Sequence, residues 1–266
     1  MGKEIDLYRR WKKAKQQLEE IFQSPEHTIV VHYSCESFYD RGDNPNSPRV
    51  TSIALRNLDS GQTKSYSIHI FAEQQGLLKS IDNHYDQLEK MMLEAFFQEA
   101  RTKQHCKWLH WNMRDANFGF EALKNRLLAL GGSPYEIDER NRFDLSRMLI
   151  SIYGVGYVGH PRIEKLMELN HVAAKDFLTG QQEADAFDAK QFVRLHQSTL
   201  RKVDVFANIA GRANNNTLIT LGTWWEKNGR SVKACIEFLK EHWIISLLGL
   251  LLSITGIIFK FTNLLG

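Results

Sequence analysis

The chain has 266 residues, of which 43% are hydrophobic and 24% are charged, and its formal net charge is +3. This composition is that of an ordinary globular protein, and the length predicts one domain of about 200 residues with appendages, or two small domains. So small a net charge does not by itself indicate a polyanionic partner. The three cysteines lie far apart without CxxC spacing, which argues against a disulfide framework or a zinc knuckle and favours reduced thiols in a cytosolic compartment.

An amphipathic helix is predicted over residues 3–23. Its apolar side chains recur at spacings of three and four residues: Leu7, Trp11, Ala14, Leu18, Ile21 and Phe22. Five basic residues cluster on the same segment: Arg9, Arg10, Lys12, Lys13 and Lys15. Such a cluster can contact phosphate or acidic lipid, but a helix packed on the domain with a solvated basic face is the favoured interpretation.

Three strand-like runs follow, at residues 28–33, 49–57 and 64–71. The Asp59-Ser60-Gly61 turn predicts a hairpin between the second and third runs. Next come a helix over 84–100 and a short apolar strand over 107–111.

The remaining predicted elements are mostly helical. A helix over 117–131 ends at Gly131, a natural C-cap, and an extended piece lies around 142–143. Further helices are predicted over 144–154, 160–170 and 179–211, the last either continuous or broken near Gln197. A hairpin followed by alternating strands and helices predicts an α/β fold with a mixed sheet covered by helices.

Acidic residues fall at particular element ends. Ser34-Cys35-Glu36 closes the first strand. Asp115 follows His110 by five residues, and Glu183 lies near the start of the long helical stretch, five residues after Leu178.

This arrangement resembles the DEDD family of 3'-5' exonucleases, and the resemblance covers roughly residues 28–200. The resemblance implies an RNase H-like fold and a two-metal site with Mg²⁺ or Mn²⁺. The residues that it implies as catalytic and as metal ligands are Glu36, Asp115 and Glu183. The match is incomplete, because Ser34 replaces the first acid of the family and brings no charge to a hard divalent ion. Leu178 stands at the position of the family's histidine and cannot act as a base.

Two alternatives remain open at this point. His171 and Asp176 have the same five-residue offset and are a rival for the third motif, although element order favours Glu183. The acids can also be ordinary polar residues at element ends, since exposed Asp and Glu are common. No HExxH, GxGxxG, P-loop or GxSxG pattern supports another chemistry.

The segment 243–259 contains no charged residue across 17 positions, which predicts a membrane-spanning helix. With its flanks, residues 243–262 are predicted to be a tail anchor. Basic residues before the segment outnumber the one lysine after it, which predicts a cytoplasmic main domain on a single-pass membrane protein. The preceding stretch, 230–243, is a predicted juxtamembrane helix that either continues into the span or lies in the membrane interface.

The predicted organisation has four parts: an N-terminal helix over 1–27, the RNase H-like domain over 28–210, a linker with the juxtamembrane helix over 211–242, and the anchor over 243–262. The first functional hypothesis is a membrane-anchored protein that binds or processes DNA or RNA through a degenerate or remodelled exonuclease-like site. The alternative is a non-catalytic scaffold or sensor of a bacterial stress or antiviral system, which signals through its membrane helix and can form a homo-oligomer.

Overall fold

The computed structural model describes residues 2–36, 48–115, 117–222 and 230–241, together with four isolated positions in the C-terminal segment. Within these residues the strands are β1 (Thr28–Cys35), β2 (Val50–Asn57), β3 (Thr63–Ser67), β4 (Lys107–His110) and β5 (Arg142–Asp144). The helices are α1 (Lys3–Gln23), α2 (Ile68–Gln74), α3 (Tyr85–Thr102), α4 (Phe120–Ala129), α5 (Leu145–Tyr153), α6 (Arg162–Leu169), α7 (Gly180–Asp188), α8 (Phe192–Asn214) and α10 (Arg230–Glu241).

The strands form one mixed sheet in the order β3-β2-β1-β4-β5. β2 runs antiparallel to both β1 and β3, whereas β1, β4 and β5 are parallel to one another. The predicted hairpin joins β2 to β3, and its turn places Gly61 at φ 71°, a conformation that favours glycine. Because parallel strands end on the same edge, Cys35, His110 and Asp144 all lie at one end of the sheet.

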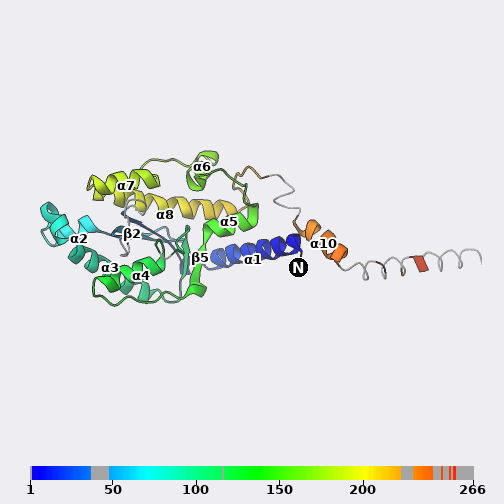
Figure 1. Cartoon of the computed structure of the whole chain (residues 1–266), viewed down its shortest axis with the longest axis horizontal. Coiled ribbons are helices and arrows are strands. Elements are labelled where there is room, and N and C mark those ends of the chain that lie inside the picture. Colours follow the sequence, from blue (N-terminus) through cyan, green and yellow to red (C-terminus); the bar gives the residue numbers. More distant parts are fainter. Residues whose placement is uncertain are drawn as a thin grey trace, which may run out of the picture.

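Helices cover both faces of the sheet, as predicted for an α/β fold (Figure 1). Alternate residues of β1 face opposite ways, so Val31 and Tyr33 join a core with α3 and α4, while Val30 joins a second core with α1, α5 and α8. All eight residues of β1 are buried. This explains why the strand reads as a continuous apolar run rather than as an alternating one.

The amphipathic helix predicted at the N-terminus is confirmed as α1. Its buried residues are Ala14, Leu18 and Ile21, which repeat at helical spacing and pack against the α5 and α8 side of the sheet. The exposed basic residues of the same helix lie on its solvent side, in agreement with the favoured interpretation of the sequence.

Two element predictions are wrong in detail. The strand predicted over 64–71 ends at Ser67, and α2 begins at Ile68, because Ile68 and Ala72 are buried four residues apart on one helical face. The long helical stretch is not broken near Gln197 but at residues 189–191, where Lys190 takes a left-handed conformation with φ 57°. Two separate helices, α7 and α8, result.

The predicted anchor over 243–262 falls almost wholly outside the described residues. Among the helices that are described, none has the length and apolar character needed to cross a bilayer.

Candidate functional site

The first and third sequence motifs meet on the α8 side of the sheet. Ser34 is fully buried near the end of β1, opposite Ser52 of β2. Its hydroxyl donates to Oε1 of Glu183 at 2.9 Å, across 149 residues of sequence. The structure therefore brings together the residue that replaces the first acid of the motif and the residue that was predicted as the last acid.

Local capping positions Glu183. Thr179 is the N-cap of α7 and accepts a hydrogen bond from the backbone N–H of Gln182, while the Gln182 side chain accepts from the backbone N–H of Thr179. This capping box fixes the first turn of α7, in which Glu183 lies. The capping of α7 thus directs the Glu183 carboxylate toward β1.

We expect Thr179→Ala to lower the free energy of unfolding by about 1 kcal/mol, because the backbone N–H of Gln182 loses its acceptor. Chemical denaturation measures this change. Thr217, which lies just after the end of α8, provides a control. Its hydroxyl donates to the Arg212 carbonyl in an exposed position, so Thr217→Ala should leave the unfolding curve nearly unchanged. Equal losses in both variants would contradict a specific role for the cap.

The carboxylate of Glu183 has three side-chain partners. Oε1 accepts from the hydroxyls of Ser34 and Ser198, the latter at 3.0 Å. Oε2 lies 2.7 Å from Nζ of Lys202, which is on α8. Both oxygens are therefore engaged by donors, and the negative charge is balanced by one ammonium.

Lys202 is held in this position by its surroundings. Its side chain is 10% exposed, compared with 14% for Glu183, so the pair is largely withdrawn from water. The ammonium also lies 5.4 Å from the centre of the Phe177 ring, a favourable cation–π geometry. The carboxylate and the ring take the place of water around this buried side chain, which lowers the cost of its burial.

Hydroxyl groups complete the floor of the site. Thr199 Oγ1 lies 2.8 Å from the Ser34 hydroxyl and 2.6 Å from the Ser52 hydroxyl. It also donates to the Leu195 carbonyl within α8. We name this set the Glu183 cluster; its members are Ser34, Ser52, Glu183, Ser198, Thr199 and Lys202.

The other two predicted site residues, Glu36 and Asp115, follow the ends of β1 and β4. Glu36 follows β1, where the pairing with β2 shifts register after Ser34, and its backbone N–H donates to Arg49. Burial raises the pKa of Tyr85 well above its ordinary value, and the charges of Glu89 and Glu36 add to that rise.

Asp115 lies in an exposed turn after β4. Its Oδ1 accepts from the backbone N–H of Asn117 at 2.8 Å, a local turn hydrogen bond. The rival residues His171 and Asp176 are exposed in the segment between α6 and α7, with φ of 54° and 62°. Within the described ranges, no three His, Cys, Asp or Glu side chains are grouped so that they could hold a metal ion.

Sequence reasoning missed Lys202, Thr199 and Ser52. These residue types are common on helices and strands, and the motifs of the exonuclease resemblance consist of acidic residues and histidine, so they do not mark these positions. The signal that was available is helical spacing, since Ser198, Thr199 and Lys202 recur on one face of a helix that follows the third motif.

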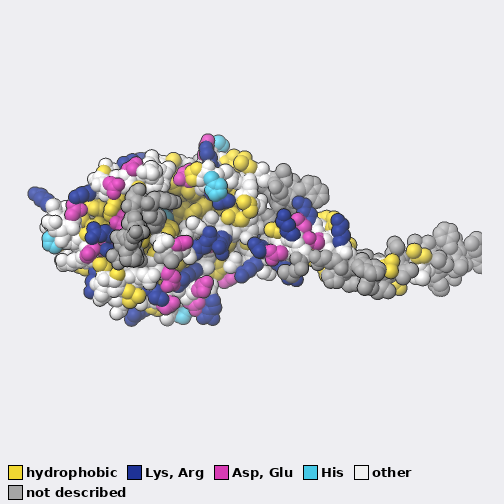
Figure 2. Space-filling model, viewed as in Figure 1, with side chains coloured by type: hydrophobic (Ala, Val, Ile, Leu, Met, Phe, Trp, Pro, Cys, Tyr) yellow, Lys and Arg dark blue, Asp and Glu magenta, His cyan; other side chains and the backbone are white. Residues whose placement is uncertain are grey.

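An aromatic surface adjoins the Glu183 cluster. His32, two residues before Ser34, packs against Phe118 and Phe206, and Trp111 stacks on Phe206 with ring centres 5.6 Å apart. Figure 2 shows hydrophobic side chains gathered over α8, between α6 and α1. His32 and Phe206 are buried, so Trp111 and Phe118 are the partly exposed rings of this group.

His32 is a buried polar side chain, only 6% exposed. Among the residues that the structure describes, neither of its ring nitrogens has a hydrogen-bond partner. Burial lowers its pKa well below the ordinary value, and the charge of Lys202 lowers it further, so the ring is neutral. Such a group costs free energy until a water molecule or a ligand satisfies it.

His110, at the end of β4, makes the free energy of unfolding depend on pH. Its Nδ1 accepts from the backbone N–H of Met113, and burial lowers its pKa to about 4. Because the folded value lies below the unfolded value of about 6.5, folding favours the neutral ring. The resulting stability is present above the unfolded pKa and is lost as the pH falls toward the folded pKa.

We expect this histidine alone to remove about 2 kcal/mol of stability between about pH 7.5 and about pH 5. His110→Asn keeps an acceptor for the Met113 N–H but does not titrate, so it should reduce the pH dependence by that amount. Urea unfolding of both proteins at the two pH values measures the difference. An unchanged slope in the variant would contradict the assignment.

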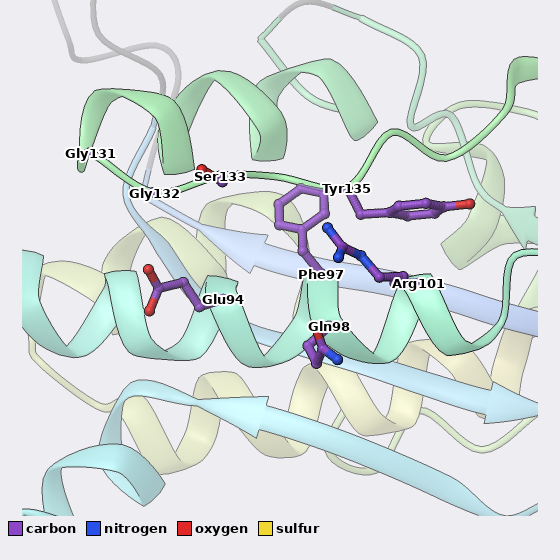
Figure 3. A pocket seen from close by; sticks show the side chains of 8 residues that line it. All are labelled: Glu94, Phe97, Gln98, Arg101, Gly131, Gly132, Ser133 and Tyr135. Carbon is purple, nitrogen blue, oxygen red and sulfur yellow. The ribbon is translucent and has the colours of Figure 1, made fainter.

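A concave site lies on the opposite side of the sheet from the Glu183 cluster, between α3 and the segment after α4 (Figure 3). It has a volume of about 260 Å³, and Arg101 lies over the Tyr135 ring at 6.0 Å. Its walls carry Glu94 as well as Arg101, and it includes no residue of the three motifs.

The chain matches no protein-family model, and no curated protein sequence matches it.

Proposed function

We propose that this is a membrane-anchored protein of RNase H-like fold that binds nucleic acid through a remodelled exonuclease-like site. In this proposal the Glu183 cluster is a binding element in which an ammonium replaces catalytic metal. The main domain lies on the cytoplasmic side, and the C-terminal segment 243–262 is the anchor.

The sheet supports the RNase H-like part of the proposal. The resemblance implied three strands, a helix, a strand, a helix and a short strand, and β1 to β5 with α3 and α4 follow that order. The mixed pairing, with β2 antiparallel to its neighbours, agrees with an RNase H-like sheet. The place where Ser34 meets Glu183 is the place where that fold would hold its metal ligands.

One observation carries the proposal: Lys202 lies 2.7 Å from Glu183 at the position where the resemblance predicts a cation. Two like unit charges 4 Å apart repel by about 4 kcal/mol at an effective dielectric constant of 20, and a divalent ion doubles this. The hydroxyls of Ser34 and Ser198 donate to the other carboxylate oxygen. The cluster therefore does not fit Mg²⁺ or Mn²⁺, and we derive no hydrolytic step through either ion.

The aromatic surface supports nucleic acid as the ligand. Exposed or half-buried rings stack on bases, and each stacked base contributes about 1–3 kcal/mol. Trp111 and Phe118 are half-buried, and Trp111 stacks on the buried ring of Phe206. Because rings stack on any base, this contact does not depend on the nucleotide sequence, and the proposal includes both DNA and RNA as ligands.

The test uses the full chain in detergent with fluorescent single-stranded DNA and RNA oligonucleotides. Binding is expected to be equal in EDTA and in Mn²⁺, with no shortening of the oligonucleotide. Trp111→Ala should weaken binding about tenfold, while Tyr135→Ala, in the concave site of Figure 3, should not. Metal-dependent cleavage that Glu183→Gln abolishes would overturn the proposal, and so would the absence of binding.

A specific contact also favours a second candidate function, the scaffold or sensor. The helix before the predicted anchor, α10, packs on α1, and Glu237 of α10 accepts from the backbone N–H of Ile5 at 2.8 Å. A signal could pass along this contact between domain and membrane, with self-association as the output. If the oligonucleotides do not bind but the chain self-associates in vesicles, this second function is supported instead.

A further inference from the structure

One face of the helix α10 packs against α1 of the domain. Ala234 is 7% exposed against α1, and the Glu237 carboxylate bonds to the first turn of α1. A carboxylate is favoured there because the first N–H groups of a helix carry partial positive charge. Gly2 permits this approach, since a Cβ atom at that position would lie 2.2 Å from the carboxyl carbon of Glu237. The contact fixes which way α10 faces (Figure 1).

The opposite face of α10 is apolar and exposed. Val232, Ile236 and Leu239 are 49%, 48% and 46% exposed. At about 100° per residue, these three side chains fall within about 60° of one another, while Ala234 and Glu237 fall on the other side. Single exposed apolar residues are ordinary, but a continuous stripe on one helix marks an interaction surface.

Basic residues flank one side of this stripe. Lys233 and Lys240 lie on α10 itself, beside the stripe in the helical projection. Figure 2 shows Lys and Arg side chains gathered over α1 and α10, and α1 exposes Lys12 and Lys13. An apolar stripe with lysines at its border is the pattern of a helix that lies in the headgroup region of a membrane.

We propose that α10 lies in the interface of an anionic bilayer, with Val232, Ile236 and Leu239 inserted and Lys233 and Lys240 at the phosphates. The inference rests on the proposed membrane anchor, because the apolar segment begins at Trp243, two residues after α10 ends. Since Glu237 and Ala234 hold the other face to α1, α10 fixes the orientation of the whole domain on the membrane.

The chemistry of the surface favours lipid over two other occupants. Nucleic acid would use the lysines but leaves the apolar stripe in water. A second copy that packed stripe against stripe would bring the lysines of both copies close together, which costs free energy. An anionic bilayer satisfies both features, because each lysine near its surface contributes to binding and the stripe leaves water.

The test measures the depth of single positions in the full chain reconstituted into vesicles. The three native cysteines are first replaced, and an environment-sensitive fluorophore is attached to single cysteines at 232, 236 and 239. Ser231→Cys is the matched control, because Ser231 is exposed and lies about 100° around the helix from Val232. Vesicles contain phosphatidylcholine with or without phosphatidylserine, and some of their lipids carry a quencher at a defined depth.

We expect positions 232, 236 and 239 to be blue-shifted and quenched in phosphatidylserine vesicles, with position 231 remaining in water. Replacing Lys233 or Lys240 by glutamine should shift the ratio of docked to undocked helix about fivefold toward the undocked state for each lysine. Equal quenching at all four positions, or at none, would overturn the inference. So would lysine variants that lose oligonucleotide binding but keep lipid docking.

Extraction with alkaline carbonate separates this inference from the proposed anchor. If the chain leaves the vesicles under carbonate, the anchor itself fails. If the chain stays in the membrane while the probes on α10 remain in water, the anchor holds and only the docking of α10 fails.

Discussion

Replacing Lys202 with methionine is expected to lower the free energy of unfolding by about 3–5 kcal/mol, because Glu183 would remain buried without its counter-charge. The side chains of both residues are at most 14% exposed, so water screens little of the loss. Methionine keeps most of the chain length, so the change isolates the charge. Equilibrium denaturation with urea measures the effect.

Two further variants make this prediction specific. Lys165→Met removes an exposed ion pair with Glu168 and should leave the denaturation midpoint unchanged. The double variant Glu183→Gln with Lys202→Met removes both charges and keeps an acceptor for the hydroxyls of Ser34 and Ser198. It should recover much of the lost stability. A Lys202→Met protein as stable as the Lys165→Met protein would contradict the account of the cluster.

Arg126→Met is expected to have an effect of similar size, about 3–5 kcal/mol. Glu89 of α3 is fully buried, and Arg126 of α4 binds both of its oxygens, at 3.0 and 2.6 Å. The same carboxylate accepts from the backbone N–H of Val50 at 2.7 Å and thereby holds the start of β2. Loss of the guanidinium would leave a charge buried between α3, α4 and the sheet.

A surface arginine provides the control for this second prediction. The side chain of Arg140 is 88% exposed and pairs with Asp138, so Arg140→Met should leave the unfolding free energy unchanged. Hydrogen exchange at Val50 gives a local measurement, since its amide should exchange faster in Arg126→Met. If Arg126→Met and Arg140→Met unfold at the same denaturant concentration, the buried pair has no such role.

The sequence predicts the layers of this fold because burial leaves periodic patterns. The α1 stripe and the apolar run of β1 each follow from which side chains are hidden, and both are visible without the structure. The limits of α2 and α7 are not visible in this way. Residues 64–71 alternate like a strand, and the break at Lys190 has neither glycine nor asparagine to mark it.

Part of the candidate site could be predicted from the order of the elements along the chain. Element order was enough to place Ser34 and Glu183 near the same strand end, and their hydrogen bond agrees with that placement. The local register shift between Ser34 and Cys35, just before Glu36, leaves no pattern in the sequence. The role of Lys202 depends on the angle between α7 and α8, which comes from tertiary packing.

Metal-dependent thermal stability tests the central claim, that Lys202 takes the place of a divalent ion at Glu183. The measurement compares the melting temperature of the full chain with and without millimolar Mn²⁺, alongside the Glu183→Gln variant. A bound ion would raise the melting temperature with its concentration, by mass action. Our account predicts no Mn²⁺-dependent rise in the wild-type chain. A saturable rise that Glu183→Gln abolishes would contradict it.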